Sequence, residues 1–373
     1  MPSALVTAFS LFFLCNLGCT PQAMTSSLRL RVVSYNLLSS HLATTTQYPT
    51  LNPEHLDAKN RLPLVLNKLE KEIQSNQNVI LCLQEVSYDW AGSLHTFLAN
   101  RGYHLVTGSY GKKFNGYMGV CLAWPQDSFV VEDVDISRIA DKREGGWPVN
   151  EEPPLLQKVW SKLQTALDKP LRKLGLVSGE DIDHWDMSER RFNVLVSATL
   201  KEKASGQSFC IGTYHMPCAF YAPMVMTIHT DLAARHVQRL AESHGSIPYI
   251  LAGDFNFKPS DPCYRLLTTG EIDSTDPYHP SPKGGVEWKP SSINMASAYA
   301  VSDHGEPDFT NYSRSRDNEP FIDTLDYIFL DKRWTVNGVL PIGKREESGG
   351  PFPNLDKDEP SDHILIAADI ELK

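Results

Sequence analysis

The sequence predicts an α/β fold in which two packed sheets carry helices on their outer faces. Many apolar runs have the length of a strand, and few helices lie between them to serve as crossovers. Three polar segments stand at the ends of these runs: LQEV at 83–86 and GDFN at 253–256 follow a run, and SDH at 361–363 precedes one. Polar groups at the ends of buried strands can gather at one edge of a sheet, so a metal-assisted hydrolytic site is the first hypothesis.

Apolar or alternating runs predict the strands, and a one-sided apolar face predicts the helices. The predicted strands cover residues 28–35, 79–83, 103–107, 119–124, 129–136, 192–200, 209–214, 247–251, 324–330 and 364–370. The predicted helices cover residues 61–74, 90–100, 223–242 and 261–267. The helix at 223–242 has the clearest signal, because Pro223 suits a first turn and an apolar stripe follows it.

One domain is predicted over residues 28–373, with an insertion at about 141–188. The insertion has a helical stretch near residues 155–174, but its apolar content is too small for a core of its own. Residues 1–23 form a separate leader. The apolar run at 4–17 has the length of a signal-peptide core and is too short for a stable membrane span. The leader is expected to be either a secretory signal peptide or a segment that is disordered or not translated; the protein is cytoplasmic if translation starts at Met24.

The net charge of −10 argues against a broad basic surface for duplex nucleic acid. A small basic cleft remains compatible with this total, because the local potential decides binding there. The sequence contains no serine-hydrolase elbow, Walker loop or zinc-protease motif. It does not determine the oligomeric state.

Glu85 follows the apolar run ILCLQ, where a carboxylate is costly unless it is paired or bound to a cation. Mg²⁺ prefers oxygen ligands, so Glu85 with an amide such as Asn36 could hold the ion. The alternative is a helix cap or a surface salt bridge. Asp254 and Asn256 lie two residues apart and face one side of an extended segment. Asp254 could orient an attacking water and Asn256 could donate to a phosphate oxygen; the alternative is an Asx-turn.

His363 precedes the last apolar run and could stabilise a charged transition state or move a proton. Such a histidine needs an orienting carboxylate, and Asp326 in TLDYIF is the candidate. Asp362 could add a carboxylate near the ion, or it could be an ordinary surface charge. His215 ends the strand FCIGTYH and could contact the phosphate from another side. For each of these residues taken singly, an ordinary structural role is the alternative.

The ordered set of motifs resembles the endonuclease/exonuclease/phosphatase superfamily. SYN, LQEV, TYH, GDFN, LDY and SDH occur in the order of that superfamily over roughly residues 30–372. Within it, SAYA, GEP, FTNYS and TLDYIF at 296–330 are most similar to nocturnin and the carbon-catabolite-repressor-type deadenylases. The resemblance implies a four-layered sandwich of two mainly antiparallel sheets flanked by helices, and Mg²⁺-dependent phosphodiester hydrolysis, with Mn²⁺ as another suitable ion.

The resemblance also implies roles for the residues. Glu85 would bind the metal with help from Asn36, Asp254 and Asn256 would position water and phosphate, Asp326 would orient His363, and His215 would contact the phosphate. The expected activity is that of a 3′-exoribonuclease on single-stranded RNA or on a nucleotide. The alternative is hydrolysis of a small phosphoester, a phosphoinositide or a phospholipid, because fold does not fix substrate.

Single-stranded RNA is held by aromatic stacking and a few cations. The candidates for these contacts are Phe309 and Tyr312 in FTNYS and Lys112 and Lys113 in GKKFNGY. The alternative is simple loop packing for the aromatic residues and solvation for the lysines.

Overall fold

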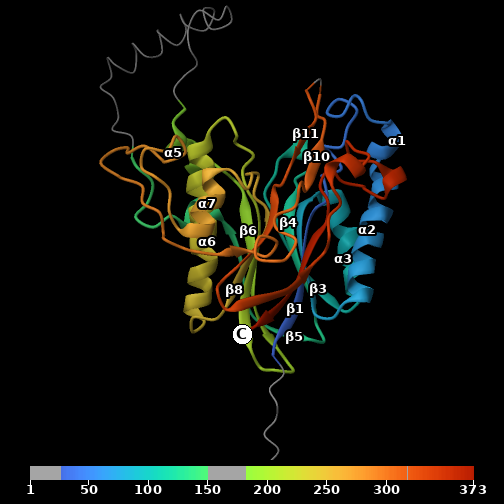
Figure 1. Cartoon of the computed structure of the whole chain (residues 1–373), viewed down its shortest axis with the longest axis horizontal. Helices are drawn as coiled ribbons and strands as arrows, with labels where there is room; N and C mark the ends of the chain where they lie inside the picture. Colours follow the sequence, from blue (N-terminus) through green and yellow to red (C-terminus); the bar gives the residue numbers. More distant parts are fainter. Residues whose placement is uncertain (1–26, 150–181, 317) are drawn as a thin grey trace, which may run out of the picture.

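The computed structural model describes residues 27–149, 182–316 and 318–373, and it contains two six-stranded sheets packed face to face (Figure 1). The first sheet has the order β13–β14–β1–β2–β4–β3. Its strands are β1 (Arg29–Asn36), β2 (Val79–Val86), β3 (Tyr103–Ser109), β4 (Gly119–Pro125), β13 (Trp334–Val339) and β14 (Ile366–Leu372). The second sheet has the order β5–β6–β7–β8–β12–β9. Its strands are β5 (Phe129–Arg138), β6 (Val194–Glu202), β7 (Ser208–His215), β8 (Tyr249–Asp254), β9 (Ala296–Ser297) and β12 (Asp326–Leu330).

Helices cover the outer face of each sheet (Figure 1). α2 (Ala58–Ser75) and α3 (Tyr88–Ala99) pack on the first sheet, and α6 (Pro223–Ser243) and α7 (Pro262–Thr269) pack on the second. The shorter elements are α1 (Pro53–Leu56), α5 (His184–Glu189), the 3₁₀ turns η1 (Lys113–Asn115), η2 (Ile139–Lys142), η3 (Arg345–Glu347) and η4 (Leu355–Lys357), and the hairpin of β10 (Asn311–Ser313) and β11 (Phe321–Asp323). The predicted four-layered α/β sandwich is confirmed.

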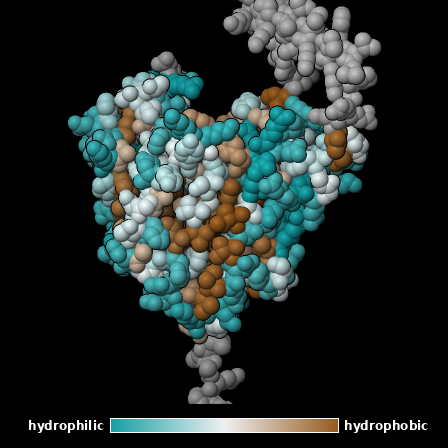
Figure 2. Space-filling view, turned by 180° about the vertical axis from the view of Figure 1, so that it is seen from behind, coloured by the Kyte–Doolittle hydropathy of each residue, from teal (hydrophilic) through white to brown (hydrophobic). Residues whose placement is uncertain are grey.

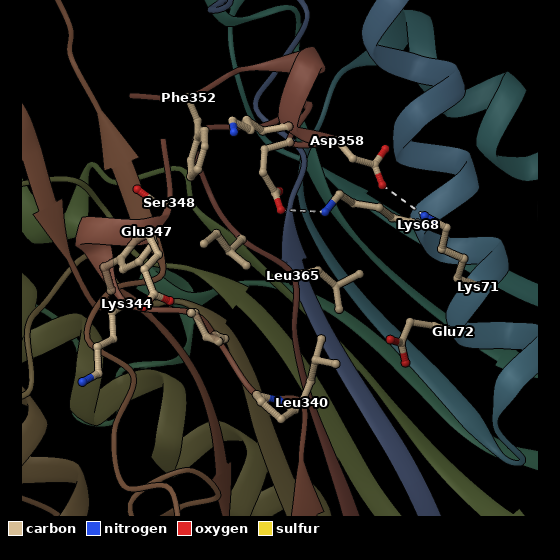
Figure 3. Close-up of a pocket in the computed structure, with 17 residues that line it drawn as sticks. Lys68, Lys71, Glu72, Leu340, Lys344, Glu347, Ser348, Phe352, Asp358 and Leu365 are labelled. Carbon is tan, nitrogen blue, oxygen red and sulfur yellow. Dashed lines mark hydrogen bonds and ion pairs between the residues drawn. The ribbon is translucent and has the colours of Figure 1, made fainter. Parts of the chain in front are cut away.

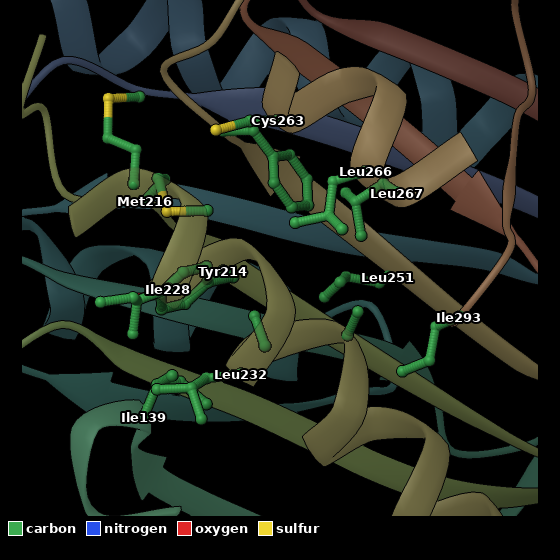
Figure 4. Close-up of a cluster of buried hydrophobic side chains, with 14 of the residues drawn as sticks. Ile139, Tyr214, Met216, Ile228, Leu232, Leu251, Cys263, Leu266, Leu267 and Ile293 are labelled. Carbon is green, nitrogen blue, oxygen red and sulfur yellow. The ribbon is translucent and has the colours of Figure 1, made fainter. Parts of the chain in front are cut away.

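Three apolar cores hold the layers together. One lies between the two sheets and includes Val32, Val196 and Ile250. A second joins the first sheet to α2 and α3. The third joins the second sheet to α6 and α7, where Tyr214 and Leu251 meet side chains of both helices (Figure 4). Each central strand is therefore buried on both faces, which explains why the sequence shows continuous apolar runs there.

The sheets are mainly antiparallel, as predicted, and the described part of each contains one parallel pair. β1 pairs with β2 and β7 pairs with β8 in parallel, and the other neighbours are antiparallel. Both parallel pairs lie in the interior of their sheets. The carboxyl ends of four buried strands consequently meet at one edge of the sandwich.

The predicted strands and long helices match observed elements with boundary shifts of a few residues. The sequence-based prediction missed α1, α5, β13 and the short strands β9, β10 and β11. β9 to β11 have two or three residues each, too few to show a period. In β13, WTVNGV contains Asn and Gly, which are depleted in strands.

The predicted leader at 1–23 and the helical stretch near 155–174 lie outside the described residues. The described ends of the predicted insertion belong to the domain: Trp185 of α5 is buried in the core beneath α6, and Trp147 packs against it. β5 and β6, on either side of the insertion, are direct neighbours in one sheet. In the part of the chain that the structure describes, no helix is both long and apolar enough to cross a membrane.

An apolar patch lies on the face opposite to that of Figure 1 (Figure 2). β5 is an edge strand with exposed apolar side chains. Its Val131, Val134 and Ile136 are the direct register partners of three core residues of β6: Leu200, Ala198 and Val196. β3 is the edge of the opposite sheet, so part of the inner face of β5 has no strand in front of it. These three side chains are between 37% and 52% exposed.

His229 of α6 should make the protein sensitive to acid. Its ring is fully buried between Tyr214 Oη, 2.9 Å from Nδ1, and the carbonyl oxygen of Ser188, 3.0 Å from Nε2. Burial is the main cause that lowers the pKa of His229 from 6.5 to about 4. The unfolded chain then binds more protons than the folded one between these values, so stability is full above pH 6.5 and falls as the pH drops towards 4. The loss is about 3 kcal/mol.

Urea unfolding of the wild type and of His229→Gln at about pH 7 and about pH 4 measures this contribution. The wild type should lose more stability on acidification than the variant does, by about 3 kcal/mol. Equal losses in the two proteins would show that His229 does not carry the effect.

Candidate active site

Four strands, two neighbours in each sheet, end at the same edge of the molecule. In the first sheet, β1 ends at Asn36 and β2 carries Glu85 next to its last residue. In the second, β7 ends at His215 and β8 ends at Asp254, and these two residues are register partners. β1 and β2 contact β7 and β8 across the sandwich, so the four side chains share one region.

Asp254 is at the centre of this region and is almost completely buried. Its Oδ2 accepts a hydrogen bond from Asn36 Nδ2 at 2.9 Å. The same oxygen is 3.5 Å from His215 Nε2 and 3.6 Å from His363 Nε2. Its Oδ1 accepts a hydrogen bond from the backbone N–H of Asn256 at 2.9 Å. One carboxylate therefore touches residues from four separate segments of the chain.

His363 is paired with Asp326, the carboxylate that the sequence suggested. His363 Nδ1 is 2.8 Å from Asp326 Oδ2, which also accepts a hydrogen bond from Thr310 Oγ1 at 2.6 Å. Burial lowers the pKa of His363, but the charges of Asp326 and Asp254 and the hydrogen bond to Asp326 together raise the pKa well above 6.5. The two carboxylates thus favour the charged form of His363, whose Nε2 lies 3.6 Å from Asp254 Oδ2.

Glu85 occupies a strained position at the end of β2. Its φ is +54°, a left-handed value that is uncommon for a residue other than glycine. The pairing of β2 with β4 shifts register between Leu83 and Val86, so Glu85 lies in a bulge. Oε2 accepts a hydrogen bond from the backbone N–H of Ser39 at 2.9 Å, and Oε1 has a long contact of 3.4 Å with Asn36 Nδ2. Strain of this kind concentrates at functional sites.

Asn256 has a similar backbone, with φ at +51°. Its Nδ2 donates to the carbonyl oxygen of Met216 at 3.0 Å. An amide nitrogen has two protons, so one remains for a ligand. The predicted donor role of Asn256 is compatible with this geometry.

The donor atoms at this edge fit a divalent cation. Ligand atoms of Asp254, Asp326 and His363 lie within 4.8 Å of one another, although Asp326 Oδ2 and His363 Nδ1 already engage each other. Asp326 Oδ1 is buried and has no hydrogen-bond partner among the described residues. A buried carboxylate oxygen without a donor is costly, and a cation would compensate it. Carboxylate oxygens suit Mg²⁺ and Mn²⁺.

Asn36 takes part in this site by holding the carboxylates. Its Nδ2 faces Glu85 and Asp254, and its Oδ1 accepts the N–H of Leu38 at 2.9 Å. The amide oxygen has a second lone pair, so this hydrogen bond does not decide whether Asn36 coordinates a metal, and that role stays a prediction.

Asp362 faces a different set of neighbours from the one expected. Its Oδ2 accepts a hydrogen bond from Tyr48 Oη at 2.8 Å, and the described residues provide no partner for Oδ1. Buried Arg61, beneath the same loop, donates to the carbonyl oxygens of Leu37 and Pro360. These contacts tie the segment before His363 to the loop after β1. Metal binding by Asp362 stays a prediction.

The four predicted substrate-binding residues differ in their accessibility. Lys112 and Lys113 are both exposed, and the Lys112 ammonium is 5.4 Å from the centre of the Phe192 ring. Tyr312 is half-buried on β10. Phe309 is only 1% exposed and packs edge-on against Tyr312. Its ring offers no free face to a base, so the expected stacking role of Phe309 is not supported.

A cavity of about 550 Å³ (Figure 3) is lined in part by Phe309 and Ile364, the chain neighbours of Thr310 and His363. Its lining includes Phe309, Leu365 and Phe352, together with the Lys68–Glu359 ion pair. Phe309 and Thr310 are adjacent, and neighbouring residues of an extended segment face opposite sides. Thr310 therefore belongs to the carboxylate–histidine site and Phe309 to this cavity.

Sequence reasoning missed several residues around the site. Thr310 lies within FTNYS, in which only Phe309 and Tyr312 were predicted to have a role. Tyr110 follows β3 and contacts His215. Phe220, 49% exposed, and Tyr221, 65% exposed, lie on the loop after His215, and the ring of Phe220 contacts that of Phe321. Two consecutive aromatic residues in CAFY, directly after TYHMP, could have indicated this loop from the sequence.

A two-sheet α/β sandwich with carboxylates, amides and two histidines at one edge defines the class of this protein. The chain belongs to the endonuclease/exonuclease/phosphatase family, because a sequence model of that family matches residues 33–363. The predicted superfamily is therefore confirmed.

Similar proteins fall within the groups that the sequence suggested. The chain is 24% identical over 365 residues to 2′,5′-phosphodiesterase 12 of Homo sapiens, covering 94% of this chain and 53% of that protein. It is 25% identical over 363 residues to the CCR4-Not complex 3′-5′-exoribonuclease subunit Ccr4 of Saccharomyces cerevisiae, covering 91% and 38%. The chain thus spans about half the length of the phosphodiesterase and less of Ccr4.

Solved structures share the fold. ANGEL2, described as a 2′,3′-cyclic phosphatase and solved with adenosine-2′,3′-vanadate, has a TM-score of 0.64 at 20% identity, over 93% of this chain and 96% of that one. The human nocturnin catalytic domain has a TM-score of 0.58 at 21% identity, over the same shares. At these identities the likeness shows the fold.

Proposed function

We propose that this protein is a divalent-metal-dependent phosphodiesterase that removes nucleotides from the 3′ end of single-stranded RNA or cleaves a related nucleotide phosphoester. The observation that carries the proposal is the position of Asp254, whose Oδ2 lies within 3.6 Å of Asn36, His215 and His363. Family membership and the printed names of the similar proteins, a phosphodiesterase and an exoribonuclease, support the reaction type.

Asp254 has the position of a group that orients water and accepts its proton as the water oxygen attacks phosphorus. The bond between phosphorus and the leaving 3′ oxygen breaks, and this oxygen takes a proton from solvent water to become a hydroxyl. The His363 imidazolium stabilises the negative charge that develops on the phosphate, and Asp326 holds its ring. His215 and Asn256 provide N–H groups for the phosphate oxygens. A cation held by Glu85, with Asn36 fixing the carboxylate, supplies positive charge to the same phosphate when bound.

Aromatic and cationic side chains near the site favour a single-stranded nucleotide substrate. Phe220 and Phe321 are in ring contact, and Lys258 Nζ is 5.2 Å from the centre of the Phe321 ring. Tyr221 is next to Phe220 and accepts a hydrogen bond from Arg191. Base stacking on such aromatics tolerates many sequences, and nearby cations track the backbone. Lys112 and Lys113 add positive charge at the turn after Tyr110.

A second candidate is a short phosphoester such as a dinucleotide, a sugar phosphate or a lipid head group. The net charge of −10 favours it, because a long polyanion is repelled by an acidic protein outside the immediate site.

A substrate panel separates the two candidates. Oligo(A), another RNA, single-stranded DNA, NADP and phospholipid head groups are each incubated with the protein and Mg²⁺, with EDTA, and with EDTA followed by excess Mg²⁺ or Mn²⁺. We expect mononucleotides to be released from the 3′ end of RNA, with loss in EDTA and recovery on adding metal. Turnover of a small phosphoester alone would select the second candidate. Turnover that is unchanged in EDTA would refute metal dependence.

A further inference from the structure

The two histidines beside Asp254 have chemically different partners on their outer nitrogens. His363 Nδ1 faces the carboxylate of Asp326 at 2.8 Å. His215 Nδ1 faces the phenol oxygen of Tyr110 at 2.6 Å, and the two rings meet edge-on with centres 6.1 Å apart. Tyr110 and His215 are both buried. The contact crosses the sandwich, because Tyr110 follows β3 of the first sheet and His215 ends β7 of the second.

The neighbours of His215 determine which of its nitrogens carries the proton. Nε2 is 3.5 Å from Asp254 Oδ2, and an ionised carboxylate is an acceptor only. Nε2 must therefore carry a hydrogen that it can donate. A neutral imidazole has one N–H, so Nδ1 becomes an acceptor and needs a donor. The described residues offer one at hydrogen-bond distance, the hydroxyl of Tyr110.

Tyr110 is suited to remain a donor. Burial, together with the charges of Glu85 and Asp254, raises the pKa of Tyr110 well above 10, so its hydroxyl keeps its hydrogen. Asp326, in contrast, brings a negative charge to His363 and favours an imidazolium there. A phenol brings no such charge to His215.

We propose that Tyr110 is a positioning residue that donates its hydroxyl hydrogen to His215 Nδ1 and so keeps the ring proton of His215 on Nε2, facing Asp254. The two histidines beside Asp254 then differ in the partner of Nδ1: a carboxylate for His363 and a hydroxyl donor for His215. His363 supplies charge, and His215 supplies a directed N–H for a phosphate oxygen. Only this last use of His215 rests on the proposed function.

The tautomer is measurable without any substrate. Full-length protein labelled with ¹⁵N at histidine is studied by NMR with and without Mg²⁺, and the His215 signals are assigned by their loss in His215→Gln. We expect a protonated Nε2 and an unprotonated Nδ1 in the wild type. A protonated Nδ1, alone or together with Nε2, would overturn the proposal.

Tyr110→Phe removes the hydroxyl and keeps the ring. We expect the His215 nitrogen shifts to move towards an average of the two tautomers, and kcat on the substrate found by the panel to fall about tenfold with little change in KM. Tyr103→Phe is the matched control, since Tyr103 begins the same strand β3 at the opposite end, and its shifts and kcat should match the wild type. Unchanged His215 shifts in Tyr110→Phe would contradict the role of Tyr110. If no substrate is turned over while the shifts behave as expected, the tautomer assignment stands and the proposed function fails.

Discussion

Replacing Asp254 by asparagine should lower phosphodiester hydrolysis by about 10³-fold or more while the protein remains folded. Asparagine has nearly the same shape but cannot accept the proton of water. It also places an amide where Asn36 Nδ2, His215 Nε2 and His363 Nε2 converge on one carboxylate oxygen. The removal of this shared negative charge affects all three neighbours together. Initial rates on the substrate selected by the panel, at saturating Mg²⁺, give the measurement.

Asp127→Asn is the matched control, because Asp127 is exposed in the turn between β4 and β5 and is not among the site residues. Its rate and its thermal unfolding should match the wild type. The Asp254→Asn variant should unfold at a temperature near that of the wild type, which separates lost chemistry from lost structure. Wild-type turnover in Asp254→Asn would rule out the proposed mechanism.

The sequence was informative where a buried strand ends in a polar residue. Glu85, Asp254 and His215 each follow a continuous apolar run, so their position at a strand end could be predicted from the sequence. Their meeting at one edge depends on the two parallel pairs, β1 with β2 and β7 with β8. Pairing direction has no local signal in these short strands. The resemblance to the family implied mainly antiparallel sheets and did not specify these two parallel pairs.

The segment FTNYS shows where sequence reasoning failed and why. Phe309 and Tyr312 were chosen as binding residues for their chemistry, but which side chains face the site is set by alternation along the chain. Thr310 binds Asp326, while Phe309 is buried next to the cavity behind it. FTNYS does not reveal which side chains face the core, because Phe309, Thr310 and Asn311 are all buried and Tyr312 is half-buried.

Tyr110 and Asp362 show a second limit. The contact of Tyr110 with His215 joins residues 105 apart, and that of Asp362 with Tyr48 joins residues 314 apart. Packing between the layers decides which groups a buried polar side chain contacts. The local sequence around these residues does not predict those contacts. Backbone strain cannot be predicted from the sequence either, because Leu38, Glu85 and Asn256 have positive φ although none of them is a glycine.

Gly253→Ala should prevent stable folding, with a loss of more than about 4 kcal/mol. Gly253 pairs with Tyr214 across the parallel contact of β7 and β8, and its φ is +152°. A Cβ at this position would lie 1.9 Å from the carbonyl oxygen of Tyr214 and 2.9 Å from its carbonyl carbon. These are backbone atoms, so no side-chain rotation can relieve the overlap, and the two strands would have to separate.

That separation would occur one residue before the His215–Asp254 pair. The close packing of β7 and β8 is therefore one reason why GDFN contains a glycine, in addition to its place beside the site. Circular dichroism and urea unfolding measure the effect. Gly92→Ala is the matched control: Gly92 lies within α3, an added Cβ meets no atom within 4 Å, and alanine favours a helix by about 1 kcal/mol. The control should unfold at the same or a higher urea concentration. A Gly253→Ala protein with the wild-type midpoint would mean that the two strands can move apart at little cost, and the close contact between them would then not explain the glycine.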